Sequence, residues 1–249
     1  MEEKKEYILI TGASSGIGSW IATRLSRNYN LILHGRNEEK LQHTRSQCDP
    51  AHEQLLFLAD LAATGELEAS LAEFIAAHQA QVVHFIHCAG FMKMLPLKAV
   101  SVESINRTFS VNVFAAALIV KVLIQKKTNS ALKSVVFISS NISNFGAKAF
   151  STYAGSKAAL DATMRCLAVE LAPRVRVNSV LPGAIPTEMT KEIFENSAVV
   201  ERMVSDYPLG LGEVNDIFEM VDFLISDRSK WITGQQFVVD GGRSIDLSA

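Results

Sequence analysis

The feature that most constrains the fold of this 249-residue chain is an alternation of short apolar runs with longer amphipathic segments. The short runs suit buried β-strands, and the longer segments suit helices that cover a sheet. The run 135–138 is apolar at every position, as expected where helices cover both faces. Because strands that alternate with helices pair in parallel, the pattern predicts a single α/β domain over residues 1–249 with a doubly wound, Rossmann-type parallel sheet. The expected strands are 7–10, 31–33, 55–58, 82–86, 135–138, 175–181 and 236–239, and the expected helices include 38–47, 67–77, 112–127 and 150–171.

Composition and charge narrow the class of partner. The formal net charge of −2 gives no electrostatic reason for a nucleic acid or an anionic membrane to bind. No apolar run reaches the length of a membrane span, and the N-terminus lacks the apolar core and cleavage site of a signal peptide. The cysteines Cys48, Cys88 and Cys166 are far apart, which fits reduced thiols and no zinc-site spacing. We therefore expect a cytoplasmic protein, without a bound metal, whose substrate is a small molecule.

A glycine-rich turn follows the first expected strand. In a doubly wound sheet, ligands bind beyond the carboxyl ends of the strands. Residues 11–18 contain the spacing Gly-x-x-x-Gly-x-Gly and run directly into a helical pattern. Glycines allow a tight turn and a close approach of backbone to phosphate, and the free N–H groups at the helix start attract the anion. The predicted phosphate-binding residues are Gly12, Ser14, Ser15, Gly16, Ile17 and Gly18.

The end of the second expected strand predicts the choice of nicotinamide cofactor. A site for NAD usually offers a carboxylate here to the adenosine 2′-hydroxyl, but Gly35 occupies that place and Arg36 follows it. A guanidinium is cationic and can bind a phosphate through two parallel hydrogen bonds. We therefore predict NADP(H), with Arg36 on the 2′-phosphate. Asn37 either assists or caps the next helix, and the residues alone leave both roles open.

Two further strand ends carry candidate cofactor contacts. After the third strand, Asp60, with Leu61 beside it, is placed either to accept from the adenine amino group or to cap the next helix. After the fourth strand, the small residues Ala89 and Gly90 would let the backbone lie against the adenine ribose. His87, just before them, is expected to tie neighbouring strands together rather than to act in catalysis.

A tyrosine and a lysine four residues apart provide a candidate acid and base. Tyr153 and Lys157 lie near the start of a strongly helical segment, so they share one helix face. An ammonium beside a phenol stabilises the phenolate and lowers a pKa that is otherwise about 10. This makes a tyrosine usable for proton transfer near neutral pH. Such a pair alone is common on solvated helices, so its meaning depends on the rest of the chain.

Together these residues resemble the short-chain dehydrogenase/reductase superfamily in its compact single-domain branch. The resemblance covers essentially the whole chain and implies an NADP(H)-dependent oxidoreductase that transfers a hydride between the nicotinamide and a carbonyl or secondary alcohol. The matching residues are the glycine-rich turn, Asp60, Ala89-Gly90, Asn112, Ser140, Tyr153 with Lys157, Asn178, Pro182-Gly183 with Thr187, and Asp240-Gly241-Gly242.

The resemblance also implies roles for individual residues. Tyr153 would exchange a proton with the substrate oxygen, Lys157 would lower its pKa and bind the nicotinamide ribose, and Ser140 would hydrogen-bond the same oxygen. Ser139 is a rival for that last role, although strand alternation points it to another face. Asn112 would distort its helix and hold a water that relays protons to the lysine. The remaining implied cofactor contacts are Pro182, Gly183, Ile185 and Thr187.

One departure from the family pattern is visible. Where the family usually has Asn-Asn-Ala-Gly, this chain has His-Cys-Ala-Gly at 87–90, which puts the local bonds between strands in doubt.

Residues 188–208 lack a strand pattern and are expected to form a helical flap over the site. The apolar residues Phe91, Met92, Met94, Phe145, Met189, Phe194 and Met203 either line a substrate cleft or belong to the core.

Substrate and assembly are less constrained by the residues. Segment 207–213 and the Asp-Gly-Gly ending suggest 3-oxoacyl-thioester reductases as functional neighbours, with sugar, polyketide and steroid-like carbonyls as competing substrate classes. In this family the helices around 112–127 and 150–171 pair between subunits, so we expect a homo-oligomer, either a tetramer or a dimer. The alternative function is a catalytically silent NADP-binding regulatory or assembly protein, which would be expected to lose one of the acid/base residues. A sugar-nucleotide epimerase usually carries a further substrate domain for which this chain has no room.

Overall fold

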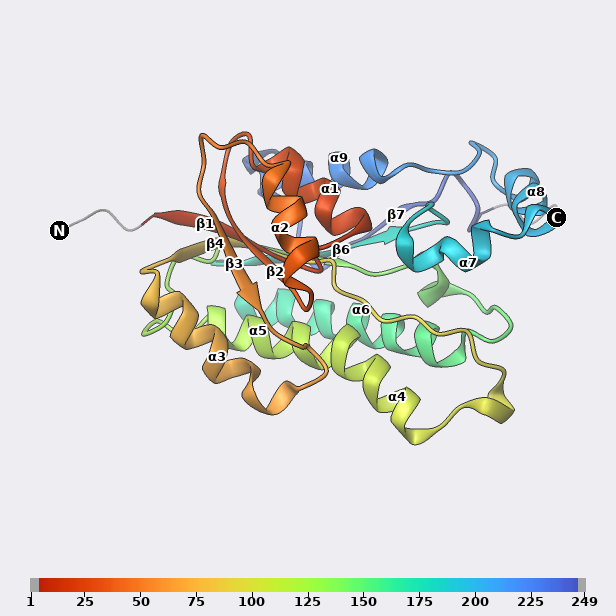
Figure 1. The fold of residues 1–249 in the computed structure, drawn as a ribbon, viewed down its shortest axis with the longest axis horizontal. Coiled ribbons are helices and arrows are strands. Elements are labelled where there is room, and N and C mark those ends of the chain that lie inside the picture. The colour runs from red at the N-terminus through yellow and green to blue at the C-terminus, as the bar shows by residue number, and fades with distance from the viewer. Residues whose placement is uncertain (1–4, 246–249) are drawn as a thin grey trace.

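The order of the strands sets the position of every other element. The computed structural model describes residues 5–245, apart from the side chain of residue 199, and this part contains a parallel seven-stranded sheet in the order β3-β2-β1-β4-β5-β6-β7 (Figure 1). Helices cover both faces, which confirms the predicted doubly wound, Rossmann-type α/β fold. The strands are β1 (Glu6–Thr11), β2 (Asn30–Gly35), β3 (Gln54–Leu58), β4 (Gln81–His87), β5 (Ser134–Ile138), β6 (Arg176–Pro182) and β7 (Gln236–Val239).

Side-chain alternation along β1 divides the core into two layers. Ile8 and Ile10 belong to one apolar cluster, whereas Tyr7 and Leu9 belong to the cluster on the opposite face. The first cluster lies under α1 (Gly16–Leu25), α2 (Glu38–Ser46) and α9 (Val214–Ile225). The second lies under α3 (Thr64–Ala77), α5 (Ala115–Leu123) and α6 (Ser151–Leu171), and Figure 1 shows the two groups of helices on either side of the sheet.

The strands and most helices agree with the expected segments. Each expected strand is confirmed to within two residues at either end. The helix α9 was not predicted, although its sequence carries a helical signal: Ile217, Val221 and Leu224 recur at helical spacing and are buried. A capping box between Glu213 and Asp216 begins this helix.

The helical stretch Val102–Leu123 corrects one expectation. It is long and apolar enough to cross a membrane by length and composition, so the statement that no run reaches that length was wrong. The stretch consists of α4 (Val102–Phe109), a π-helical turn η2 (Ser110–Phe114) and α5. The α5 part lies against the sheet, with Ile119, Val120 and Leu123 in the core. Because the core of a soluble domain passes the same test, we interpret it as a core helix.

Several short elements lie beyond the carboxyl ends of the strands (Figure 1). The expected helical flap is present as the 3₁₀ turn η4 (Glu188–Thr190), α7 (Lys191–Phe194) and α8 (Ser197–Asp206). The 3₁₀ turns η1 (Leu97–Ala99) and η3 (Asn141–Asn144) also follow strand ends, whereas η5 (Asp227–Ser229) lies near the amino end of β6, where Arg176 donates to the carbonyl of Ser226 at 3.2 Å. In chain order, β2 and β3 are added on one side of β1, and β4 to β7 are added on its other side. The loops that follow β1 and β4 therefore run in opposite directions and leave room for a ligand between them.

Candidate active site

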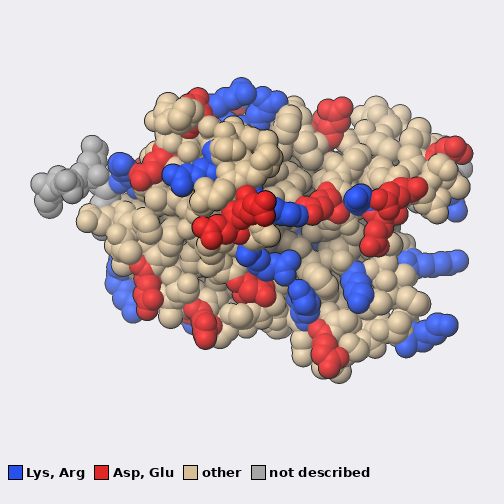
Figure 2. Space-filling model, viewed as in Figure 1, with Lys and Arg blue, Asp and Glu red and all other residues tan. Residues whose placement is uncertain are grey.

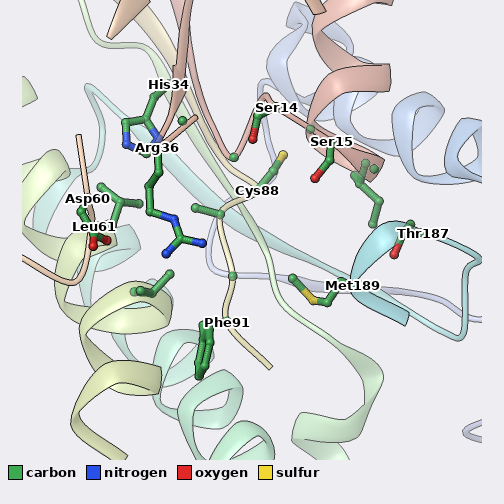
Figure 3. A pocket seen from close by; sticks show the side chains of 18 residues that line it. Ser14, Ser15, His34, Arg36, Asp60, Leu61, Cys88, Phe91, Thr187 and Met189 are labelled. Atoms are coloured by element: carbon green, nitrogen blue, oxygen red, sulfur yellow. The ribbon is translucent and has the colours of Figure 1, made fainter. Parts of the chain in front are cut away.

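A cavity lies at the carboxyl ends of β1 and β4, where the strand order changes direction (Figure 3). Its position is the one at which doubly wound sheets bind nucleotides. Most of the predicted cofactor residues come together in its wall, namely Gly12, Ser14, Ser15, Gly16, Ile17, Gly18, Arg36, Asp60, Leu61, Ala89, Gly90 and Thr187. Pro182, Gly183 and Ile185 are not among the lining residues and lie on the backbone that leads from β6 to Thr187.

The glycine-rich turn is packed too tightly for side chains at two positions. A Cβ on Gly12, whose φ is +68°, would lie 2.7 Å from the backbone nitrogen of Ala89. A Cβ on Gly18 would lie 2.2 Å from the carbonyl oxygen of Gly12. Ser15 is the N-cap residue of α1, but its side chain makes no capping hydrogen bond. The first N–H groups of α1 therefore have no side-chain acceptor from Ser15, and the turn fits the phosphates of a dinucleotide.

Arg36 and Asp60 lie near each other in the wall of the cavity, at the end where the adenosine is expected (Figure 3). Arg36 follows β2 directly and is exposed at the cavity wall. The Asn37 side chain accepts a hydrogen bond from the backbone N–H of Lys40 at 2.8 Å and so caps α2, which is one of the two roles expected of it. Asp60 also makes a local contact, in which one carboxylate oxygen accepts from the backbone N–H of Ala62 at 3.0 Å. Its other carboxylate oxygen has no such role in the turn.

His87 supplies the strand-tethering bond that the family pattern left in doubt. Its Nδ1 lies 2.8 Å from the hydroxyl of Thr11, and that hydroxyl also accepts from the backbone N–H of Ala89 at 3.3 Å. Burial lowers the pKa of His87 to about 3, so the ring is neutral at physiological pH. The side chain thus joins β4 to β1 and fixes the start of the Ala89-Gly90 segment, as expected of a structural residue.

The proposed acid/base residues form one buried group beside this cavity. Tyr153 and Lys157 are 8% and 3% exposed, and the Lys157 Nζ lies 5.8 Å from the centre of the Tyr153 ring. The Ser140 hydroxyl hydrogen-bonds to the Tyr153 side chain. A Cβ on Gly90 would lie 3.7 Å from the Lys157 Nζ and 3.8 Å from the Asn112 Oδ1. Gly90 therefore joins the cofactor cavity to the acid/base residues.

Burial decides the protonation of the pair. It raises the pKa of Tyr153 to about 12, and the hydrogen bond from Ser140 opposes this rise only in part. It lowers the pKa of Lys157 to about 8, against the charge of the nearby Asp161. The expected lowering of the tyrosine pKa by the lysine is therefore not the dominant effect, because a phenolate in this place loses its hydration. Lys157 donates a hydrogen bond to the carbonyl of Ile138 at 2.8 Å.

Asn112 lies in the π-helical turn η2 and is fully buried. Its Oδ1 accepts from the backbone N–H of Phe91 at 2.7 Å, and its Nδ2 donates to the Phe91 carbonyl at 3.1 Å and to the Ser156 hydroxyl at 2.9 Å. Ser156 in turn donates to the carbonyl of Tyr153 at 2.7 Å. The local π-helical geometry is the helix distortion that the resemblance implied for this residue. Asn112 thereby joins the loop after β4 to the first turn of α6.

The two consecutive serines after β5 have different partners. Ser140 faces Tyr153, whereas the Ser139 hydroxyl donates to Asp161 at 3.0 Å. Asp161 is buried one turn after Lys157 on α6. Ser140, not Ser139, thus lies beside the tyrosine, as expected, but strand alternation is not the reason, because both serines follow the end of β5 and both contact α6.

The loop after β6 packs on the C-terminal turn. A Cβ on Gly183 would lie 2.8 Å from the Cβ of Asp240, so this approach requires a glycine. Asp240 accepts hydrogen bonds from Asn141 at 3.1 Å and from the backbone of Gly242 at 3.1 Å. Asn178, another family match, donates to the carbonyl of Ile232 at 3.1 Å and holds the approach to β7. These bonds connect the segment after Ser140 with the backbone that leads to Thr187.

Some cavity residues were not among the predicted cofactor contacts. They are His34, Gly35, Cys88, Phe91, Val111 and Met189. Most of them directly adjoin a predicted residue, and extending each strand-end motif by one position would have found them. Met189 belongs to the flap, and its methyl group would lie 3.4 Å from a Cβ on Gly90. Figure 3 shows it across the cavity from Arg36.

Comparison with known proteins places this site in a family. A family model described as "Enoyl-(Acyl carrier protein) reductase" matches residues 12–244. The chain belongs to the short-chain dehydrogenase/reductase superfamily. This short-chain dehydrogenase/reductase is similar to the L-xylulose reductase of Caenorhabditis elegans. The two are 32% identical over 242 residues, which cover 95% of each chain. A cyclopentanol dehydrogenase of Comamonas sp. is 30% identical over 245 residues, which cover 95% of this chain and 96% of the relative.

Solved structures agree with this membership. A 4-hydroxyisoleucine dehydrogenase mutant in complex with NADH and succinate has a TM-score of 0.89 and 27% identity, and the match covers 96% of this chain and 99% of that one. A gluconate 5-dehydrogenase of Burkholderia cenocepacia in complex with NADP and tartrate has a TM-score of 0.87 at 22% identity, over 98% of this chain and 97% of that one, which supports the fold alone. The relatives support an oxidoreductase of this superfamily, while the solved neighbours include complexes with either cofactor.

Proposed function

We propose that this short-chain dehydrogenase/reductase is an NADP(H)-dependent enzyme that transfers a hydride between the nicotinamide and a carbonyl or secondary alcohol, with Tyr153 as general acid and base. One observation carries the proposal. The buried Tyr153 is hydrogen-bonded to Ser140, and Lys157 on the same helix face approaches Gly90 in the wall of the cavity that contains the glycine-rich turn. A regulator without catalysis would not need to keep this buried group intact.

Tyr153, Ser140 and Lys157 have different roles in the proposed reaction. When bound, the nicotinamide supplies or accepts the hydride. Because the pKa of Tyr153 is about 12, its phenol is protonated at neutral pH and can give its proton to a carbonyl oxygen. The Ser140 hydroxyl would donate to the same oxygen, where negative charge develops. Lys157 would bind the ribose next to the nicotinamide. Alcohol oxidation requires Tyr153 to lose its proton first, so only a small fraction of the protein has the phenolate needed for oxidation at neutral pH.

The choice of NADP(H) rests on Arg36. Gly35 offers no carboxylate to a 2′-hydroxyl, and the guanidinium of Arg36 is exposed in the cavity wall. We expect Arg36→Ala to weaken NADPH binding about tenfold or more, in line with the loss of a charge-assisted bidentate contact, and to leave NADH binding unchanged. Equal affinity of the unaltered protein for NADPH and NADH would contradict this assignment.

Tyr153→Phe tests the reaction itself. It removes one oxygen and should reduce turnover about 10²- to 10⁴-fold, the usual contribution of general acid–base catalysis, while NADPH binding stays nearly intact. Tyr29→Phe, after α1 and away from the cavity lining, is the matched control. The substrate is sought by following NADPH oxidation with acyl-thioesters, keto-sugars, quinones and cyclic ketones. Unchanged turnover in Tyr153→Phe would refute the mechanism, and NADPH binding without turnover on any carbonyl would favour the silent regulator.

Location and assembly remain predictions. The chain is proposed to act in the cytoplasm on a small carbonyl or alcohol, without a nucleic acid, membrane or metal as partner. Figure 2 shows acidic and basic side chains interspersed over one face of the molecule. It is also proposed to form a tetramer or a dimer through the faces of α5 and α6. Val169 on α6 is 82% exposed, so this helix carries an apolar side chain that such an interface would cover. Sedimentation that shows a stable monomer at working concentration would contradict the proposed assembly.

A further inference from the structure

A salt bridge crosses the outer part of the cofactor cavity. Lys40, in the first turn of α2, pairs with Glu188 at the start of η4, so the bridge joins segments 148 positions apart in the sequence. Both residues line the same part of the cleft as Arg36 and Ser15. The backbone of Lys40 is held by the Asn37 cap at the beginning of α2. The bridge therefore connects the adenosine side of the cleft with the flap segment.

The two cations of this cleft differ in their partners. Arg36 takes part in none of the ion pairs between residues 5–245, whereas Lys40 is neutralised by Glu188. The Glu188 carboxylate also hydrogen-bonds to Ser15 in the phosphate-binding turn. These contacts, with Lys40 first, hold the pKa of Glu188 below its usual range. The carboxylate thus lies beside both a lysine and a hydroxyl of the phosphate-binding turn.

We propose that Lys40 is a second specificity-determining residue for NADP(H), and that Glu188 is an exchangeable anion that pairs with Lys40 until a 2′-phosphate replaces it. This inference rests on the proposed NADP(H) function and deepens it, because it names a residue pair that the strand-end pattern does not contain. Arg36 is ready to receive the phosphate at once, and Lys40 becomes available when the bridge opens.

The exchange is favourable for a phosphate and unfavourable for a hydroxyl. The side chains of Lys40 and Glu188 keep 49% and 55% of their exposure, and ion pairs this exposed contribute little to stability. A phosphate monoester carries a charge of about −1.5 to −2 at neutral pH, more than the carboxylate it displaces. The 2′-hydroxyl of NAD(H) has no charge with which to compete for Lys40. Breaking the salt bridge therefore reduces the binding free energy of NADP(H) only slightly, whereas NAD(H) gains no interaction with Lys40.

The exchange also reaches the flap. Thr187, which precedes Glu188, packs against Gly16 of the phosphate-binding turn, where its Cβ would lie 3.3 Å from a Cβ on that glycine. Met189, which follows Glu188, lies against Gly90 in the opposite wall. Glu188 lies between these two residues in the sequence, so its release from Lys40 removes the salt bridge that holds this segment to α2. NADP(H) binding is thereby coupled to the first turn of the flap.

Equilibrium titration of the full-length protein with NADPH and with NADH tests the inference. We expect Lys40→Gln to weaken NADPH binding about five- to tenfold, as for one charge-assisted contact, and to change NADH binding less than about twofold. Glu188→Gln should tighten NADPH binding about three- to fivefold, because Lys40 is then free before the ligand arrives. In the Lys40→Gln background, Glu188→Gln should have almost no effect.

The matched control is Lys121→Gln. Lys121 forms a comparable surface pair with Glu68 at 2.6 Å, away from the cavity, and its removal should alter neither affinity. An unchanged NADPH affinity in Lys40→Gln, together with a preference for NADPH that Arg36→Ala abolishes, would overturn the inference and leave the proposed function intact. An equal effect of Glu188→Gln in both backgrounds would also overturn it, because Glu188 would then act only as a repelling charge. Equal binding of NADPH and NADH by the unaltered protein would defeat the proposed cofactor as well.

Discussion

Replacing Gly18 by alanine should destabilise the fold and weaken cofactor binding together. A Cβ on Gly18 would lie 2.2 Å from the Gly12 carbonyl oxygen and 3.2 Å from the Cβ of Cys88. Favourable contacts between carbon atoms lie at about 3.5–4.0 Å, so either the turn or the start of α1 must move by roughly 1 Å. Overpacking of this kind costs about 1–3 kcal/mol. The same movement changes the backbone N–H groups that are proposed to hold the phosphates.

Gly155→Ala is the matched control, because it adds the same methyl group elsewhere. Gly155 is an exposed residue of α6, and a Cβ there would meet no heavy atom within 4 Å. Alanine in an exposed helix interior is about 0.5–1 kcal/mol more favourable than glycine. The two substitutions should therefore change the free energy of unfolding in opposite directions, with a difference of about 1.5–4 kcal/mol.

Two measurements decide the matter. Urea denaturation followed by circular dichroism gives the free energies of unfolding, and titration gives the NADPH dissociation constants. Gly18→Ala should be the less stable variant and bind NADPH about tenfold more weakly, which corresponds to about 1.4 kcal/mol. Gly155→Ala should be at least as stable as the unaltered protein and bind as well. If Gly18→Ala keeps both stability and affinity, the turn tolerates a side chain, and close packing is not the reason for this glycine.

Two pH-dependent predictions follow from the burial of the acid/base pair. Because the pKa of Tyr153 is about 12, its phenolate fraction rises nearly tenfold per pH unit below that value, so kcat/KM for alcohol oxidation should increase from pH 6 to 9, and a flat profile would count against Tyr153 as the base. The Asp161 carboxylate raises the pKa of Lys157 and so opposes the effect of burial. Asp161→Asn should therefore lower the pKa of Lys157 and move the alkaline decline of ketone reduction to lower pH. An unshifted pH profile would show that Asp161 does not act on the lysine.

Much of the cofactor cavity was predictable because of one topological rule. Parallel strands bring their carboxyl ends to one edge of the sheet, so residues separated in sequence, such as Gly16, Arg36 and Gly90, meet if the strands are identified correctly. The strands were identifiable because they are apolar runs bounded by turns. The acid/base pair was visible for a related reason, since helical spacing alone places Tyr153 and Lys157 on one face.

Contacts between segments that no periodicity relates were not predictable. The pairing of Lys40 with Glu188 depends on where the loop after β6 returns across the cavity, and no sequence pattern relates the two positions. The pKa of Tyr153 is a similar case. Sequence spacing gives the distance to the lysine but not the loss of hydration, which depends on the packing of α6 and the loops around it, and hydration has the larger effect here. His87 shows the intermediate situation: its structural role was expected, but its partner, Thr11, required the register of β1 and β4.

Burial of the acid/base pair gives the two serines after β5 different roles. A phenol and an amine that lie in the same dry place each favour the neutral form, one through a raised pKa and the other through a lowered one. Polar partners oppose both shifts in part. Ser140 bonds to Tyr153, and Ser139 bonds to Asp161, which in turn raises the pKa of Lys157. Both serines directly follow β5 and contact α6, on which Tyr153 and Asp161 lie about two turns apart, so each serine supports a different member of the acid/base group.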